Sequence, residues 1–304
     1  MDGHGHGMGK GDRGTARRSS SPWRSAAWLL AVGLALGVLA APAPARARDM
    51  TLVTLNLHHD RDDWPGRREY IADELQALQP DVVALQEVLE HEDLPNQAAW
   101  LAGRLGYDYE FTSVDPVGAP KRYGNALLTR RPVLMRRQRW LQPLDDYRMA
   151  AQLRIDIDGQ PVNVYVTHLN ERADGQGRRI RTRQVADLLR FVAETADQEP
   201  VVIAGDFNST ADADDLQALR SGYGDGYGSV HRDSRDGTLN MEIYRKPARI
   251  DHVFFQQRRL LAREARIIFT QPDARGRWAS DHYGVWTRLQ FASDEGSPPA
   301  DAGR

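Results

Sequence analysis

Polar side chains that could bind ions or transfer protons follow several apolar runs of this 304-residue chain. The clearest case is VVIAGDFNST (Val201 to Thr210), in which four apolar residues run directly into Gly-Asp-Phe-Asn. A strand followed by an ordinary turn would give the same residue types, because Gly, Asp and Asn are common in turns. The alternative is a reactive site at the mouth of a strand. This segment alone does not distinguish the two interpretations.

The other predicted strand ends favour the reactive site. Burying polar groups at the end of an apolar run costs free energy unless those groups have partners. One or two such residues could be satisfied core residues, but six strand ends are better explained by one shared site. The residues are Asn56, Glu87, His168, Asp206 with Asn208, Asp251, and Asp281 with His282.

The elements that must position these residues follow from the hydrophobic periodicity. Strands outnumber helices, and several are apolar on both faces, which favours a layered α/β arrangement of two packed sheets with helices outside. We expect a hairpin across residues 150–169 that turns at Asp158-Gly159. The other expected strands are residues 50–57, 80–88, 125–133, 201–208, 249–255 and 282–291, and the expected helices are 67–78, 97–106 and 178–194.

The ordered set of motifs resembles the endonuclease/exonuclease/phosphatase superfamily, the DNase I-like fold. GDFN and SDH are the most specific motifs, LQEV is less specific, and TLNL and THL are weak individually. The resemblance implies a four-layer α/β sandwich, in which two packed mixed β-sheets are flanked by helices. Between residues 50 and 291 the motifs occur in the order TLNL, PDVVALQEV, YGNALLT, YVTHL, the RTRQ helix, VIAGDFN, RIDHVF and SDHYGV.

The resemblance also implies a divalent-metal site. Hydrolysis of a phosphate ester requires charge neutralisation on the phosphoryl oxygens, an activated water and protonation of the leaving oxygen. Carboxylate and amide oxygens are hard ligands that suit Mg²⁺ or Mn²⁺. The implied metal ligands are Asn56, Glu87 and Asp281. The sequence leaves open whether one or two metal ions bind.

The implied catalytic residues surround that site. Asp251 is paired with His282, and a carboxylate that accepts from an imidazole fixes its tautomer and raises its basicity. His282 can then activate water or hold phosphate. Asp206 and Asn208 bind and orient the nucleophile and the phosphoryl group, and His168 stabilises developing charge or protonates the leaving group. The general base is either Asp206 or the Asp251–His282 pair.

Three further residues, Tyr123, Asn125 and Arg148, are implied to face phosphate. Asn125 departs from the DNase I-like nucleases, which have a glutamate two residues after the active-site tyrosine to support the histidine equivalent to His168. An amide cannot raise the basicity of an imidazole as a carboxylate does. Asn125 therefore departs from strict DNase-like chemistry, and direct contact with phosphate is the alternative role. Arg148 faces either phosphate or solvent.

Two histidines follow the first predicted metal ligand. His58 and His59 lie in NLHHD, close behind Asn56 and therefore near the mouth of the site. A solvated loop is favoured over contact with substrate or with a second metal ion.

The chain begins with the pattern of a secretory signal peptide across residues 1–47. A basic segment precedes the apolar run at residues 26–41, and small residues follow up to Ala47. A retained membrane anchor is the alternative, but the run is shorter than the roughly 20 residues that a spanning helix needs. We expect residues 48–292 to form the endonuclease/exonuclease/phosphatase domain, exported to the periplasm or the extracellular space as a monomer without a membrane segment. Residues 293–304, rich in Pro, Gly, Ser and Asp, are expected to be a disordered tail.

Composition narrows the function further. The chain has no cysteine, which excludes disulfides and thiol catalysis. Of its 40 Lys and Arg and 42 Asp and Glu, six and two lie in the first 47 residues, so the remainder carries a formal charge near −6. The negative net charge therefore does not favour tight binding of nucleic acid, although RRIRTR (178–183) could form a local basic patch.

The predicted function is that of an exported Mg²⁺- or Mn²⁺-dependent phosphoesterase. It would hydrolyse phosphodiester or phosphomonoester bonds, with a nuclease slightly favoured. The alternatives are a phosphoinositide or inositol-phosphate phosphatase and a sphingomyelinase-like lipid phosphodiesterase. An inactive binding module is a remote alternative, because such a domain is expected to have lost one of the site residues.

Overall fold

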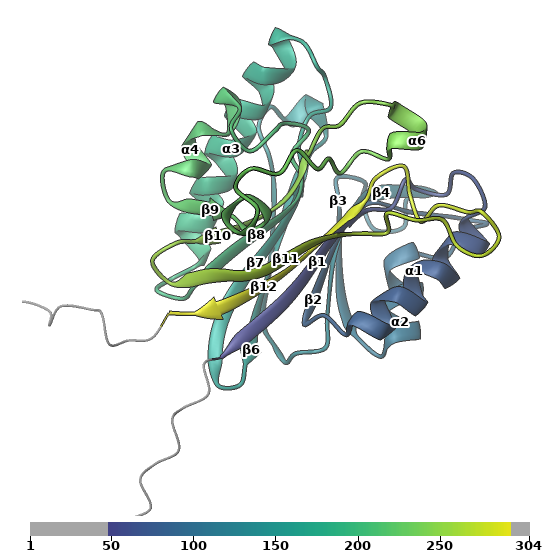
Figure 1. Cartoon of the computed structure of the whole chain (residues 1–304), viewed down its shortest axis with the longest axis horizontal. Coiled ribbons are helices and arrows are strands. Elements are labelled where there is room, and N and C mark those ends of the chain that lie inside the picture. Colours follow the sequence, from purple (N-terminus) through teal and green to yellow (C-terminus); the bar gives the residue numbers. More distant parts are fainter. Residues whose placement is uncertain (1–47, 293–304) are drawn as a thin grey trace, which may run out of the picture. The chain divides into compact units, whose positions relative to one another are not determined.

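The computed structural model describes residues 48–292, so the predicted signal peptide and tail lie outside it. Two six-stranded mixed β-sheets pack face to face in this part of the chain (Figure 1). The first sheet has the order β11-β12-β1-β2-β4-β3. Its strands are β1 (Asp49–Asn56), β2 (Val82–His91), β3 (Asp108–Ser113), β4 (Lys121–Thr129), β11 (Leu260–Ile268) and β12 (Gly284–Phe291).

The second sheet has the order β5-β6-β7-β8-β10-β9. In each sheet one central pair of strands is parallel, β1 with β2 and β7 with β8, and the other neighbours are antiparallel. The strands of this sheet are β5 (Val133–Trp140), β6 (Met149–Ile157), β7 (Gln160–His168), β8 (Val201–Asp206), β9 (Tyr223–Asp225) and β10 (Asp251–Gln256).

Helices cover the outer faces of both sheets. The first sheet packs on α1 (Trp64–Leu78) and α2 (Gln97–Leu105), and the second sheet packs on α3 (Gly175–Thr195) (Figure 1). This confirms the predicted four-layer α/β sandwich. No helix among residues 48–292 is long and apolar enough to cross a bilayer. The short helices are η1 (Leu144–Asp146), η2 (Asp214–Leu216), α4 (Gln217–Arg220), α5 (Gly226–Val230) and α6 (Met241–Tyr244).

Side chains alternate along each strand, so the two apolar faces of a buried strand contact different layers of the sandwich. In β1, Leu52 belongs to the core between the sheets, whereas Val53 and Leu55 pack against the helix layer. The same division holds in β8, where Ala204 faces the other sheet and Ile203 faces the layer of α3. Because side chains alternate with a period of two, a strand buried on both faces reads as a continuous apolar run, as the sequence predicted.

Two expectations about the strands have different outcomes. The hairpin at Asp158-Gly159 is confirmed, with φ values of 53° and 87°. Positive φ at both central positions suits a tight hairpin turn. The single strand expected at residues 125–133 is wrong, because β4 ends at Thr129 and β5 begins at Val133 in the other sheet. Pro132 lies between them and cannot donate to a strand ladder, which explains the break.

Candidate active site

The predicted site residues converge at one edge of the sandwich. In the first sheet Asn56 ends β1 and lies opposite Gln86, the last residue of β2 that pairs with β1. In the second sheet Asp206 is flanked by His168 of β7 and Asp251 of β10. A hydrogen bond of 3.1 Å from Asn56 Nδ2 to Asp206 Oδ2 joins the two sheets at this edge. The strand ends of both sheets therefore build one shared site.

A β-bulge turns Glu87 into this site. Val83 and Leu85 of the same strand face the helix layer, so regular alternation would place Glu87 there as well. The register with β4 shifts between Leu85 and Val88, and Glu87 takes a positive φ of 56°. Such a φ is uncommon for a residue other than glycine, and bulges next to active sites re-aim a side chain in this way. The Glu87 carboxylate consequently lines the central cleft.

The GDFN segment is a tight turn in which each residue has a separate role. A Cβ on Gly205 would lie 2.0 Å from the carbonyl oxygen of Thr167, so only glycine fits there. Phe207 is fully buried in the core under α3. Asn208 has a φ of 50°, and its backbone N–H donates to Asp206 Oδ1 at 2.8 Å. The turn thereby holds the Asp206 and Asn208 side chains on the same side of the strand end.

A buried ion pair supports this turn from behind. Arg181 Nε donates to Asp215 Oδ2 at 2.6 Å, and the two side chains are only 4% and 1% exposed. The same carboxylate accepts the Ser209 hydroxyl at 2.8 and 2.9 Å, directly after GDFN. Arg181 belongs to the RRIRTR segment, so one of the four arginines in the predicted basic patch is structural and not available to a ligand.

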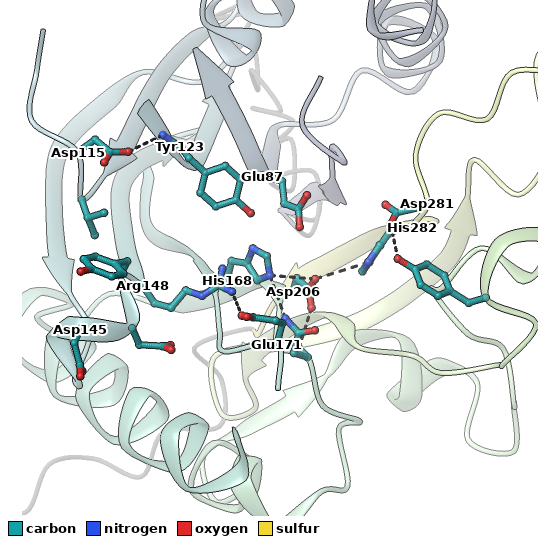
Figure 2. A pocket seen from close by; sticks show the side chains of 15 residues that line it. Glu87, Asp115, Tyr123, Asp145, Arg148, His168, Glu171, Asp206, Asp281 and His282 are labelled. Carbon is teal, nitrogen blue, oxygen red and sulfur yellow. Dashed lines mark hydrogen bonds and ion pairs between the residues drawn. The ribbon is translucent and has the colours of Figure 1, made fainter. Parts of the chain in front are cut away.

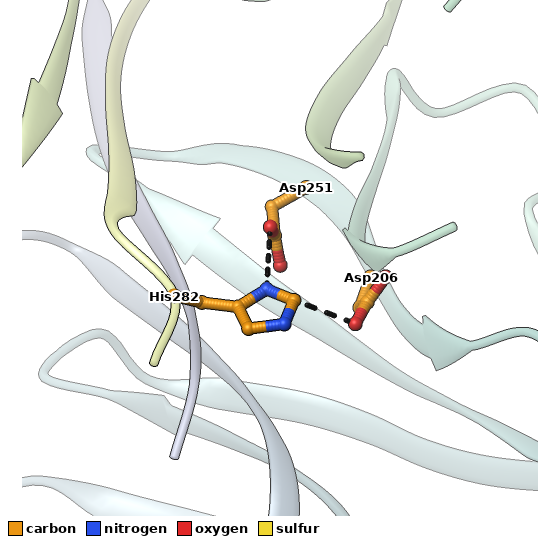
Figure 3. Close-up of side chains that lie close together, drawn as sticks. All are labelled: Asp206, Asp251 and His282. Carbon is orange, nitrogen blue, oxygen red and sulfur yellow. Dashed lines mark hydrogen bonds and ion pairs between the residues drawn. The ribbon is translucent and has the colours of Figure 1, made fainter. Parts of the chain in front are cut away.

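Asp206, Asp251 and His282 form a buried cluster (Figure 3). One carboxylate oxygen of each aspartate and one ring nitrogen of the histidine lie within 4.8 Å of one another, close enough to hold a metal ion together. His282 Nδ1 lies 2.8 Å from Asp251 Oδ2 and 3.9 Å from Asp206 Oδ2. Burial alone would lower the pKa of His282, but the charge of Asp251 and its hydrogen bond outweigh burial and raise that pKa to about 10. Burial and the nearby Asp251 carboxylate raise the pKa of Asp206. The cluster thus keeps a proton at neutral pH.

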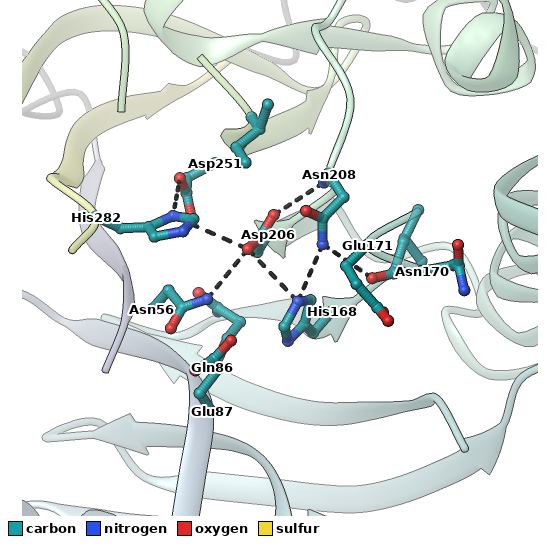
Figure 4. A network of polar contacts seen from close by, with 12 residues as sticks. Asn56, Gln86, Glu87, His168, Asn170, Glu171, Asp206, Asn208, Asp251 and His282 are labelled. Carbon is teal, nitrogen blue, oxygen red and sulfur yellow. Dashed lines mark hydrogen bonds and ion pairs between the residues drawn. The ribbon is translucent and has the colours of Figure 1, made fainter. Parts of the chain in front are cut away.

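Asp206 is the centre of a wider polar network (Figure 4). His168 Nε2 lies 3.5 Å from Asp206 Oδ2 and 3.1 Å from Asn208 Nδ2, which also donates to the carbonyl of Leu169 at 3.1 Å. Burial, with a contribution from the Arg148 guanidinium, lowers the pKa of His168 well below its usual value of 6.5. His168 is therefore a neutral ring in the free protein.

Six of the predicted site residues line a cleft of about 790 Å³: Glu87, His168, Asp206, Asn208, Asp281 and His282 (Figure 2). Tyr123 and Arg148 also line it, and Arg148 is only 13% exposed and paired with Glu171. Arg148 therefore lies at the cleft and does not face open solvent, and its contact with phosphate stays a prediction. Asn125 instead is buried and donates to the Met149 carbonyl at 3.1 Å, outside the lining of the main cleft. Its predicted contact with phosphate stays a prediction.

Several cleft residues were not predicted from the sequence. Tyr244 lies on α6 and donates its hydroxyl to Asp281 Oδ2 at 2.6 Å. Asp145 and Asp146 come from η1, and Tyr147 follows them with a positive φ of 55°. All four lie in connections between strands and follow no apolar run, so the signal that located the other residues was absent.

The expectation that His58 and His59 lie in a solvated loop is wrong. Their side chains are 21% and 32% exposed, and each imidazole contacts a predicted metal ligand. His58 Nδ1 lies 2.9 Å from Asp281 Oδ1, and His59 Nε2 lies 3.1 Å from Glu87 Oε2. The two rings therefore contact two residues that line the cleft, Asp281 and Glu87, without lining it themselves.

The oxygen atoms of the predicted metal ligands Asn56 and Glu87 suit a hard divalent cation. Burial would raise the pKa of Glu87, but the hydrogen bond and the charge of the nearby His59 ring help to lower it to about 2, so the carboxylate is ionised. Asn56 Oδ1 accepts one hydrogen bond, from the His58 backbone at 2.9 Å. A carbonyl oxygen has a second lone pair, which stays available to an ion. Carboxylate and amide oxygens with room for waters are what Mg²⁺ and Mn²⁺ require.

Residues 53–282 match the model of the endonuclease/exonuclease/phosphatase family, and the chain belongs to that family. Members of this family hydrolyse phosphate esters and generally depend on divalent metal ions. Both the predicted family and the predicted fold are thereby confirmed.

Two curated relatives match about half of the chain. Nocturnin of Drosophila melanogaster is 28% identical over 161 residues, which are 48% of this chain and 24% of that protein. The uncharacterized protein YbhP of Escherichia coli K12 is 30% identical over 177 residues, or 52% of this chain and 66% of YbhP. The match thus spans about a quarter of one relative and about two thirds of the other.

Solved structures of the same fold cover more of the chain. TDP2 of D. rerio, complexed with a single-strand DNA product, superposes with a TM-score of 0.67 at 18% sequence identity. The superposition covers 79% of this chain and 98% of that structure. At this identity the likeness establishes the fold.

Proposed function

We propose that this protein is an exported, Mg²⁺- or Mn²⁺-dependent phosphodiesterase, with nucleic acid as the favoured substrate. The main observation behind this proposal is the position of Asp206, which lines the cleft and contacts residues from both sheets. The bulge that turns Glu87 toward the same cleft adds an ionised ligand. Fold families host varied substrates, so this proposal rests on the site.

Each residue has a distinct role in the proposed reaction. Asn56, Glu87 and Asp281 would hold the metal ion, which supplies positive charge to the phosphoryl oxygens. The Asp251–His282 pair presents a proton on the ring to a phosphoryl oxygen, because Asp251 stabilises the imidazolium.

The remaining roles concern the nucleophile and the substrate anion. Asp206 accepts a proton from the attacking water, since its carboxylate is buried and its pKa is raised toward neutrality. The Asn208 amide and the His168 ring lie beside it and orient the phosphoryl group. Arg148 adds a positive charge on the facing wall of the cleft.

The nucleic-acid preference rests on two supports. A protein of the same fold, TDP2, holds a single-strand DNA product. The cleft is open and carries the exposed ring of Tyr147, which is 69% accessible. A base could stack on such an aromatic ring. Export is proposed from the amino-terminal pattern of residues 1–47.

One observation favours a second candidate, a phosphodiesterase for lipid head groups. The rim of the cleft carries more carboxylates than cations, and acidic walls oppose a long polyanion more than a zwitterionic head group such as phosphocholine. The carboxylates at the rim are Asp115, Asp145, Asp146 and Glu171.

The test is a substrate panel with the purified protein. Plasmid DNA, RNA, sphingomyelin and phosphoinositides are each incubated with Mg²⁺ or with EDTA, beside a Glu87→Gln control. We expect metal-dependent nicking that the variant lacks. Release of phosphocholine or of inorganic phosphate would instead select a lipid or inositol substrate. A folded protein that is silent on every substrate would overturn the assignment as an enzyme.

A further inference from the structure

The dipeptide His58-His59 contacts all three predicted metal ligands. The His58 backbone N–H donates to Asn56 Oδ1 at 2.9 Å. The His58 ring reaches Asp281 Oδ1 at 2.9 Å, and the His59 ring reaches Glu87 Oε2 at 3.1 Å. Ionised carboxylates only accept hydrogen bonds, so each imidazole donates the N–H that faces its carboxylate.

The backbone of this dipeptide is held in a conformation that a free loop would avoid. His58 and His59 have φ values of 54° and 35°. Two consecutive positive φ values outside glycine are costly, and such strain persists only where the surroundings over-determine it. The structure must therefore contain groups that fix both residues.

A buried guanidinium and a buried amide supply that constraint. Arg67 is 2% exposed and donates to the carbonyl oxygens of Leu57 at 2.7 Å and His59 at 2.9 Å. Gln97 is fully buried and donates to the same His59 carbonyl at 2.7 Å. The carbonyls point inward to these donors, and both rings consequently point outward to the two carboxylates.

We propose that His58 and His59 are positioning residues, which orient Asn56, Glu87 and Asp281 for a divalent metal ion. One oxygen of each carboxylate accepts a hydrogen bond from an imidazole, and this restricts the rotation of the carboxylate. Partners of this kind around a metal site typically change metal affinity about 10–100-fold when they are removed. This inference rests on the metal site of the proposed function.

The test measures metal affinity and not turnover. Mn²⁺ and Mg²⁺ are titrated by calorimetry into the wild-type protein and into His58→Ala, His59→Ala and the double variant, after treatment with EDTA. We expect each single variant to bind Mn²⁺ at least about 10-fold more weakly and the double variant more weakly still. His59→Gln should recover much of the loss, because a Gln amide can also donate to Glu87.

His231→Ala is the matched control. His231 Nε2 lies 2.8 Å from the Ala265 carbonyl oxygen, and the residue lines a different pocket, beside Tyr227 and Asp236. Its Mn²⁺ affinity should stay within twofold of wild type. Thermal melts in EDTA should be alike for all variants, which separates orientation from folding.

Two results would overturn the inference. Wild-type Mn²⁺ affinity in the double variant would show that the rings do not orient the ligands. Tighter binding in the alanine variants would show that the imidazoles compete with the ion for the carboxylates. Failure of the wild-type protein itself to bind Mn²⁺ or Mg²⁺ would instead remove the metal site, and the proposed function would fall with it.

Discussion

Replacing Asp251 with Asn tests how the buried cluster works, because this change removes one charge and little else. The amide keeps the shape of the side chain and can still accept from His282 Nδ1, which lies 2.8 Å from Asp251 Oδ2. Asp251 is fully buried, so solvent cannot replace the lost charge. The variant therefore separates the charge of the pair from its geometry.

The magnitude follows from the pKa of His282. Asp251 is the main group that raises this pKa from 6.5 to about 10, against burial, which lowers it. That difference corresponds to about 5 kcal/mol in favour of the imidazolium. In Asp251→Asn we expect the pKa of His282 to fall to 6.5 or below. Loss of the charged donor from the phosphoryl oxygen should lower kcat/KM by about 10²–10³-fold, or about 3–4 kcal/mol.

The same pair gives a pH dependence of stability. A histidine whose pKa is raised on folding stabilises the protein fully below its unfolded pKa, near 6.5, and loses that contribution as the pH rises through about 10. Asp251→Asn should thus lower the Tm most at pH 6–7, and the difference from wild type should shrink toward pH 10.

Three measurements examine this reasoning. The titration of His282 is followed by NMR in metal-free protein, kcat/KM is measured on the substrate that the panel identifies, and Tm is recorded from pH 6 to pH 10. A pKa of His282 that stays near 10 in the variant would refute the electrostatic argument. A kcat/KM within threefold of wild type would show that the charge of the pair has no part in the reaction.

Other variants test the metal site and the turn behind it. Glu87→Gln should lower kcat/KM more than tenfold and recover partly at high Mn²⁺; unchanged turnover would remove Glu87 from the metal site. Gly205→Ala would place a Cβ 2.0 Å from the Thr167 carbonyl oxygen. Chemical denaturation of that variant should show a loss of about 3 kcal/mol, since the backbone must shift to relieve the overlap. Arg181→Met leaves Asp215 buried without its partner and should cost about 3–5 kcal/mol by the same assay; a loss below about 1 kcal/mol would contradict the structural role of the pair.

The sequence by itself determined the layered fold and most of the polar residues that the structure brings together at the cleft. The central strands β1, β2, β7 and β8 are buried on both faces, so each forms a continuous apolar run in the sequence. The polar residues that follow these runs could therefore be recognised. Polar groups at strand ends are therefore the ones that a single sequence reveals. The order of the motifs then predicted the family, and the family match across residues 53–282 confirms that prediction.

The tertiary structure determined the positions of the side chains that depend on contacts between different elements. Glu87 enters the cleft only because a bulge forms where β2 pairs with β4, and pairing between strands is not visible in either strand alone. Tyr244 reaches Asp281 from the four-residue helix α6, which is too short to show a periodic pattern. His58 and His59 read as a solvated loop because their constraint comes from Arg67 and Gln97, on other elements. In each case the deciding contact joins residues that are distant in the sequence or in different elements, so only the folded chain brings it about.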